Sequence, residues 1–182
     1  MKKNFLFLFF IFYFTNALAS DKQNIIENLS NIENLTFKFE QNINGKIEKG
    51  NCIIQYPKKI FCKYDLGNKK ILVSNGKSLV IKTTSSFYIY PLKKTPLNLI
   101  LDKDYLINKI KYLDKKVVDS NFINFKFIES ENEISIFFSK KSYNLIGWQT
   151  IDIYQNLSIT FISLLEKNIK IDNNIFKLPE QN

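Results

Sequence analysis

Alternating apolar and polar residues predict a β-hairpin in the first third of the chain. From Cys52 to Tyr56 every second side chain belongs to one largely apolar face, and a period of two is typical of a strand. Pro57 then begins a turn, and the run from Ile60 to Asp65 repeats the alternation. We therefore expect two adjacent antiparallel strands here.

A second hairpin is predicted directly after the first. Ser74-Asn75-Gly76-Lys77 lies between the apolar runs 71–73 and 79–81, and Asn-Gly tolerates the positive backbone angles that a tight turn requires. A short strand at 87–90 follows. These strands predict a continuous antiparallel sheet.

Helices are predicted in three other segments. Thr95-Pro96 resembles an N-cap followed by proline at the first helical position, which predicts a helix over 96–101. A second short helix is expected over 102–113. Asp21 to Leu35 is expected to form an amphipathic helix, because apolar residues recur at helical intervals at Ile25, Ile26, Leu29 and Ile32.

The rest of the chain has the pattern of strands joined by turns. Leu35 to Gln41 alternates strictly, and further strands are expected at 121–129, 133–140, 146–154 and 158–167, with a last strand ending at Pro179. The chain has 182 residues, is 45% hydrophobic and 15% aromatic, and contains no internal repeat or linker. These features predict a single α+β, mainly antiparallel β domain over residues 20–182.

Residues 1–19 have the layout of a secretory signal peptide. Lys2 and Lys3 precede a short apolar run, and Ala17-Leu18-Ala19 fits a small-x-small cleavage site. The alternative is a membrane anchor, but the run is much shorter than the roughly 20 residues that span a bilayer. We expect cleavage after Ala19 and export to the periplasm.

Charge narrows the choice of partners only slightly. The formal net charge is +9, and removal of residues 1–19 takes away two lysines and no acids, which leaves +7. Export argues against nucleic acid, and the lysines are interleaved with acids. They are explained either as solvated turns and strand faces or as attraction to an anionic membrane or an acidic partner.

The sequence lacks the residues that most enzymatic mechanisms require. With no histidine, Ser-His-Asp triads, Cys-His pairs and HExxH zinc sites are excluded, and there is no Gly-rich phosphate loop. The carboxylates near predicted turns, which a glycosidase would need as a pair, are Asp102, Asp104, Glu129, Glu131 and Glu133. We expect them to be solvated, so we predict neither catalysis, metal nor cofactor.

Cys52 and Cys62 are the only cysteines. Their even spacing places them on the same face of the first predicted hairpin, and the turn near Pro57 sets them opposite each other. In an exported protein this arrangement favours a structural disulfide. The alternative is a pair of buried thiols that act as small hydrophobic groups.

In order, several segments resemble the LolA family of periplasmic lipoprotein carriers. They include Val-Ser-Asn-Gly-Lys-Ser-Leu at 73–79, Pro-Leu-Lys-Lys-Thr-Pro-Leu at 91–97 and Ile-Gly-Trp-Gln-Thr-Ile-Asp at 146–152. Phe39 and Gln41 after the first helix are similar as well. The resemblance implies an incomplete, half-open β-barrel whose concave apolar face is covered by helices.

The resemblance also changes how the apolar faces are explained. On their own, they are explained as a dry core beneath a helix-covered sheet. In the family the same space holds the acyl chains of a lipoprotein, which implies a cavity lined by Leu35, Phe37, Phe39, Ile54, Tyr56, Ile60, Tyr64, Leu97, Ile100 and Leu101.

Tyr56 departs from the family pattern. The family has an arginine immediately before the proline of the first hairpin, which holds the helical lid through hydrogen bonds to the backbone. Tyr56 can supply one hydrogen bond from its hydroxyl and can close the cavity mouth with its ring, but it lacks the several donors of a guanidinium.

The resemblance implies a monomeric carrier that moves acylated lipoproteins from the inner to the outer membrane. Its implied partners are an inner-membrane lipoprotein-releasing ABC transporter (LolCDE-like) and an outer-membrane acceptor (LolB-like), where a separate acceptor is present. Two alternatives remain open. One is a periplasmic lipoprotein or lipid sensor on the same fold, and the other is a secreted enzyme.

Overall fold

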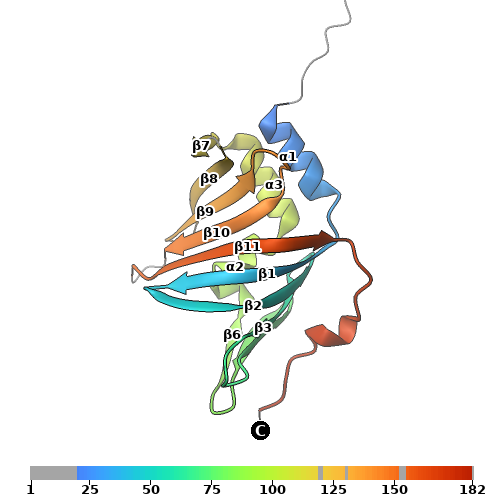
Figure 1. Cartoon of the computed structure of the whole chain (residues 1–182), viewed down its shortest axis with the longest axis vertical. Helices are drawn as coiled ribbons and strands as arrows, with labels where there is room; N and C mark the ends of the chain where they lie inside the picture. The colour runs from blue at the N-terminus through green and yellow to red at the C-terminus, as the bar shows by residue number, and fades with distance from the viewer. Residues whose placement is uncertain (1–19, 119–120, 130, 152–154, 182) are drawn as a thin grey trace, which may run out of the picture.

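An open antiparallel sheet with helices on one side forms the body of the molecule (Figure 1). The computed structural model describes residues 20–118, 121–129, 131–151 and 155–181. The helices are α1 (Asp21–Ser30), α2 (Leu97–Ile100) and α3 (Lys103–Tyr112), with the short 3-10 helices η1 (Leu92–Lys94) and η2 (Asn173–Phe176). The strands are β1 (Asn34–Ile43), β2 (Lys46–Gln55), β3 (Lys59–Tyr64), β4 (Ile71–Asn75), β5 (Ser78–Lys82), β6 (Phe87–Pro91), β7 (Lys116–Val118), β8 (Phe122–Glu129), β9 (Asn132–Ser139), β10 (Leu145–Ile151) and β11 (Leu157–Lys167).

Within these described ranges the sheet has 11 strands in the order β6-β5-β4-β3-β2-β1-β11-β10-β9-β8-β7. Strand β1 pairs with β2 on one side and with β11 on the other, so the two halves of the sheet join at β1. The end strands β6 and β7 are not neighbours in the sheet, which is therefore not closed into a barrel. The predicted fold class, an α+β protein with an incomplete antiparallel barrel, is confirmed.

The main core lies between the sheet and the helices. Alternate residues of the strands face inward, and Phe37, Phe125 and Phe138 are among the largest side chains that are fully buried. Ile25 and Leu29 of α1 and Leu106 and Ile110 of α3 belong to the same apolar cluster. The two longer helices thus cover one apolar face of the sheet, as predicted from their amphipathic spacing.

The first helix is shorter than its apolar spacing indicates. Ser20 caps its start, because the Ser20 Oγ accepts a hydrogen bond from the Gln23 N–H. The helix ends at Ser30 instead of Leu35, because Leu35 belongs to β1, where it lies opposite Ile54. Leu35 therefore has the spacing of the helix but belongs to the following strand.

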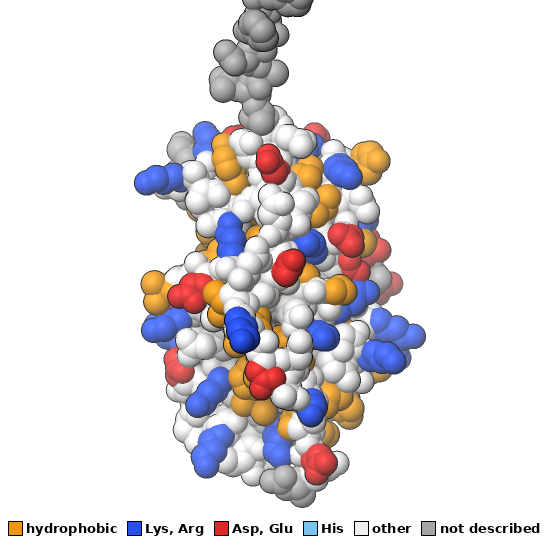
Figure 2. All heavy atoms as spheres, turned by 90° about the vertical axis from the view of Figure 1, so that its right-hand side faces the viewer, with side chains coloured by type: hydrophobic (Ala, Val, Ile, Leu, Met, Phe, Trp, Pro, Cys, Tyr) orange, Lys and Arg blue, Asp and Glu red, His pale blue; other side chains and the backbone are white. Residues whose placement is uncertain are grey.

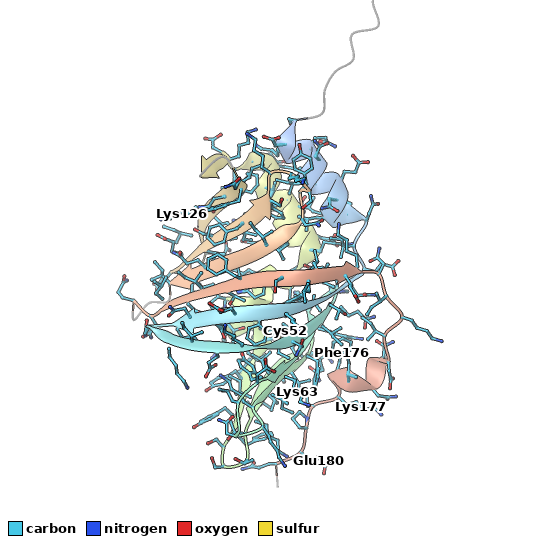
Figure 3. The ribbon with its side chains drawn as sticks, in the orientation of Figure 1. Cys52, Lys63, Lys126, Phe176, Lys177 and Glu180 are labelled. Atoms are coloured by element: carbon cyan, nitrogen blue, oxygen red, sulfur yellow. A yellow bond between two sulfur atoms is a disulfide. The ribbon has the colours of Figure 1, made fainter. Side chains whose placement is uncertain are left out.

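Two local predictions near the other helices and the C-terminus are wrong. Thr95 does not cap α2 with its side chain, because the Thr95 Oγ1 donates to the Leu92 carbonyl at 2.8 Å instead. The predicted last strand is the helix η2, whose first turn is capped by the Asp172 carboxylate at 2.9 Å from the Asn174 N–H. Phe176 of η2 is buried, and η2 contacts β3 and β4 (Figure 3).

The predicted strand at 146–154 corresponds to β10, but residues 152–154 lie outside the described residues, as does the predicted signal peptide.

In the part of the chain that is described, the longest helices have ten residues, so no helix is long and apolar enough to cross a membrane. Figure 2 shows lysine side chains scattered over the displayed face with acidic and apolar side chains between them. On that face the positive charge does not form one continuous patch.

Candidate functional site

A cavity of about 200 Å³ lies between the sheet and helix α2. The described residues that line it are all uncharged, and most are apolar. They come from seven strands and from the segment that begins α2. They are Phe39, Gln41, Cys52, Ile60, Cys62, Tyr64, Leu72, Leu79, Thr95, Pro96, Leu97, Ile100, Trp148, Thr150, Ser158 and Thr160.

The structure divides the ten predicted cavity residues into two groups. Five line the cavity, namely Phe39, Ile60, Tyr64, Leu97 and Ile100. The other five do not line it. Leu35, Phe37, Ile54 and Leu101 are 0–2% exposed within the adjoining core, and Tyr56 is partly buried against that core.

The cavity wall contains the predicted cysteine pair. Cys52 and Cys62 lie opposite each other on β2 and β3, with their Cα atoms 4.1 Å apart, and their sulfur atoms form a disulfide. Both residues line the cavity. Figure 3 labels Cys52 on β2 near the middle of the sheet. The disulfide therefore links the two strands in the wall of the cavity.

One end of the cavity is polar, and sequence reasoning missed it. This polar end consists of Gln41, Tyr64, Thr150, Ser158 and Thr160. The Gln41 Nε2 donates to the Ser158 Oγ at 3.1 Å, and the Tyr64 hydroxyl lies 3.4 Å from the Gln41 Oε1. The available signal was the alternation of β1, because Gln41 continues the inward face of Phe37 and Phe39.

A buried carboxylate lies next to this end of the cavity. Glu48 is opposite Gln41 in the sheet, its side chain is 2% exposed, and it pairs with Lys70 and with Lys46. Burial raises the pKa of Glu48, but hydrogen bonds and charge from the two lysines outweigh burial and lower the pKa overall. Burial and the Glu48 charge raise the pKa of Tyr64 above its usual value, so its phenol is neutral.

The helices α2 and α3, which we call the lid, are fixed to the turn between β2 and β3 by Lys58. Its backbone N–H donates to the Leu101 carbonyl at 2.9 Å, and its Nζ lies 3.0 Å from the Asp102 Oδ2. The Asp102 Oδ1 accepts from the Tyr105 N–H and caps α3. Lys103 adds a hydrogen bond to the Ile32 carbonyl at 2.8 Å.

The expected hydrogen bond from the Tyr56 hydroxyl to the lid is not formed. This oxygen is buried and has no partner among the described residues, and burial raises the pKa of the phenol. The Tyr56 ring does approach the lid, because the Lys103 Nζ lies 6.0 Å from its centroid. The polar contacts between this turn and the lid are made instead by Lys58, two residues further along the chain.

The five carboxylates near the predicted turns have structural partners or are exposed. Glu129 accepts from the Tyr105 hydroxyl at 2.7 Å and from the Lys109 Nζ at 2.8 Å, while Glu133 pairs with Lys126. The pKa of Glu129 is lowered, chiefly by the hydrogen bond from Lys109. Glu131 and Asp104 are exposed. Across the described ranges there is no group of three or more residues suited to hold a metal ion.

The open antiparallel sheet, the short helices that cover it and the uncharged cavity between them place this chain among α+β proteins with an internal cavity. The family model described as outer membrane lipoprotein carrier protein LolA matches residues 30–179. The chain therefore belongs to the LolA family. A search of curated proteins found no match.

Several solved structures are similar to this chain at low sequence identity. One is an uncharacterized conserved protein from Thermus thermophilus, with a TM-score of 0.50, 7% identity and coverage of 88% of this chain and 93% of that chain. A LolA superfamily protein from Nitrosomonas europaea has a TM-score of 0.46, 9% identity and coverage of 88% and 99%. The MucA/MucB complex from Pseudomonas aeruginosa has a TM-score of 0.46, 9% identity and coverage of 88% and 62%. These likenesses concern the fold alone.

Proposed function

We propose that this protein is a periplasmic carrier that holds the acyl chains of lipoproteins in its cavity and moves them from the inner to the outer membrane. The observation that carries the proposal is the uncharged, mainly apolar cavity between the sheet and α2 in a chain of the LolA family. Transfer of an acyl chain from water into such a space is favourable by about 0.8 kcal/mol for each buried CH₂ group.

The size of the cavity implies that it widens when cargo enters. Its volume is about 200 Å³, whereas pockets that enclose drug-sized ligands have volumes of about 300–1,000 Å³. Leu97 and Ile100 of α2 form the wall opposite the sheet. Displacement of the whole lid would break the two contacts of Lys58, the hydrogen bonds of Lys103 and the contacts of Tyr105 and Lys109 with Glu129.

Release of the cargo requires a competing apolar site. A chain of many CH₂ groups that is buried in the cavity does not return to water at a useful rate, because each group adds to the free energy of dissociation. We infer an inner-membrane ABC transporter as the donor and an outer-membrane lipoprotein acceptor as the receiver. We further propose export with cleavage after Ala19, which would put the carrier in the compartment between these two membranes.

The test is purification of the full chain from the periplasm, followed by mass spectrometry of the N-terminus and of everything that co-purifies. We expect Ser20 at the N-terminus and acylated lipoprotein in complex with the protein. A fluorescent acyl probe should bind the delipidated protein. Leu97→Asn should weaken this binding at least tenfold, because it places an amide in the cavity wall.

Leu99→Asn is the matched control for that variant. Leu99 is on the same helix and is also partly buried, but it does not line the cavity. It should bind the probe like the wild type. Retention of Met1 in the periplasmic protein, or a wild type that binds neither lipoprotein nor acyl probe, would contradict the proposal.

A further inference from the structure

The cavity has two chemically different parts. Phe39, Ile60 and Leu79 belong to its apolar part. Gln41, Thr150, Ser158 and Thr160 of the polar end lie where β11 pairs with β1 and β10, and Tyr64 of β3 joins them through its hydroxyl, 3.4 Å from the Gln41 Oε1. In the ladder Gln41 lies opposite Thr160, and Thr150 lies opposite Ser158. A cavity that held only hydrocarbon would gain nothing from these hydroxyl and amide groups.

Thr160 has a hydrogen-bonding capacity that the folded chain does not use. The residue is 3% exposed and lines the cavity, and its Oγ1 has no hydrogen-bond partner among the described residues. Buried polar groups in folded proteins are almost always paired. The Oγ1 atom is itself buried in the empty protein, at the wall of a cavity that we infer to widen when cargo enters. A buried hydroxyl without a partner at this place therefore points to a polar group on the ligand.

The charge of the polar end limits what that group can be. Every described residue that lines the cavity is neutral. The nearest buried carboxylate, Glu48, is paired with two lysines and does not line the cavity. A phosphate or a carboxylate would be buried here without a counter-charge, which is strongly unfavourable. Hydroxyl and amide donors suit a neutral carbonyl oxygen.

We propose that the polar end binds the ester carbonyl that joins an acyl chain to glycerol, with Thr160 as its principal donor, while the chain fills the apolar part. This inference rests on the proposed function and adds a selectivity to it, because the cavity would prefer glyceryl esters to free fatty acids. The same ester occurs in the diacylglyceryl group of a lipoprotein and in free glycerolipids.

The experiment is displacement of a fluorescent acyl probe by three competitors with equal chain length, each below its aggregation threshold. 1-Palmitoylglycerol and 1-O-hexadecylglycerol differ only in the carbonyl group, and palmitate carries a charge. The ester should displace the probe at a concentration about fivefold lower than the ether, which is the effect of one ordinary hydrogen bond. Palmitate at pH 7 should be weaker than the ester.

Thr160→Val removes the hydroxyl at nearly constant volume. It should abolish the preference for the ester over the ether and should not lower the melting temperature, because the hydroxyl has no partner among the described residues of the empty protein. The matched control is Thr36→Val. The Thr36 Oγ1 is also buried and unpaired within the described chain, but Thr36 does not line the cavity, so this variant should keep the preference.

The possible results separate this inference from the proposed function. A wild type that binds ester and ether equally, or a Thr160→Val variant that keeps the preference, overturns the inference and leaves the carrier proposal intact. A wild type that binds none of the probes overturns both. A diacylglyceryl-cysteine peptide that binds more tightly than free dipalmitoylglycerol supports the inference with lipoprotein as the source of the ester, and the reverse order supports it with glycerolipid as the source.

Discussion

Phe39 and Tyr64 contact each other edge to face, with ring centroids 5.0 Å apart, across Gly50 of the strand between them. A Cβ atom on Gly50 would lie 2.2 Å from the Lys63 carbonyl oxygen and 2.9 Å from the Phe39 Cε1. The missing side chain on β2 is therefore what allows two cavity residues on β1 and β3 to meet. This wall of the cavity depends on a glycine that does not itself line it.

Gly50→Ala should destabilise the protein by about 1–3 kcal/mol, because the added methyl group forces backbone and ring shifts in a packed wall. Urea unfolding measures the loss. Gly67→Ala is the control, because nothing lies within 4 Å of the Cβ that it would add. Equal stability of the two variants would contradict the proposed role of Gly50.

Phe37→Ala should lower the free energy of unfolding by about 3–5 kcal/mol, because it removes a ring that is 2% exposed and leaves a void in the core. Phe161→Ala is the comparison, since Phe161 is 55% exposed and its loss should cost much less. If Phe37→Ala were stable and bound acyl probes more weakly, Phe37 would belong to the cavity wall and not to the core.

The Cys52–Cys62 disulfide should stabilise the protein by about 2–3 kcal/mol. The stabilisation is modest because the bond closes a short loop, with a sequence separation of 10 residues. Denaturation of the wild type with and without reductant measures this difference. Reductant should have no effect on the Cys52→Ala, Cys62→Ala double variant. Alkylation of both thiols in the denatured, non-reduced wild type would show that the bond is absent in solution.

Glu48 should make stability depend on pH in the acidic range. Its pKa in the folded protein is lower than its ordinary value of 4.5, so the folded state favours the carboxylate. Its contribution is fully present above pH 4.5 and is lost as the pH falls through the folded pKa. The free energy of unfolding, measured at several pH values between 7 and 3, should therefore fall more steeply with decreasing pH for the wild type than for Glu48→Gln. An equal pH dependence in the two proteins would contradict the stabilising role of the Glu48 carboxylate.

The ion pair between Lys58 and Asp102 should slow opening of the lid. Asp102→Asn keeps an oxygen that can cap α3 but loses the charge, so amide exchange over 97–112 should accelerate while α3 remains helical. The control is Lys49→Met, which removes a more exposed ion pair with Glu40 that is remote from the lid. Unchanged exchange in Asp102→Asn would show that this ion pair does not help to hold the lid closed.

Most of the order of strands and helices could be predicted from the sequence, because alternation and turn chemistry are local. The exceptions are β7, which was not predicted, and η2, which was predicted as a strand. The hairpin at Asn75-Gly76 is an example, since its turn residues lie between two short apolar runs that form β4 and β5. Element ends were less predictable. Leu35 has the spacing of the preceding helix, yet its pairing with Ile54 places it in β1.

The face of each cavity residue could be predicted, but its exposure to the cavity could not. Ile54 and Ile60 are opposite each other on neighbouring strands, yet only Ile60 lines the cavity. A cavity forms where the opposing element does not fill the space, and that depends on where α2 lies over the sheet. The polar end was missed for another reason, because a search for apolar faces stops at Phe39 and leaves out Gln41.

The free edges of the sheet at β6 and β7 allow the curvature of the sheet to vary. In a closed barrel the diameter is fixed by the number of strands and their stagger. In the described part of this sheet no pairing joins β6 to β7, so its curvature can change through strand twist while every existing pairing is kept. In the proposed carrier, such a change of curvature would adjust the width of the cavity to acyl groups of different number and length.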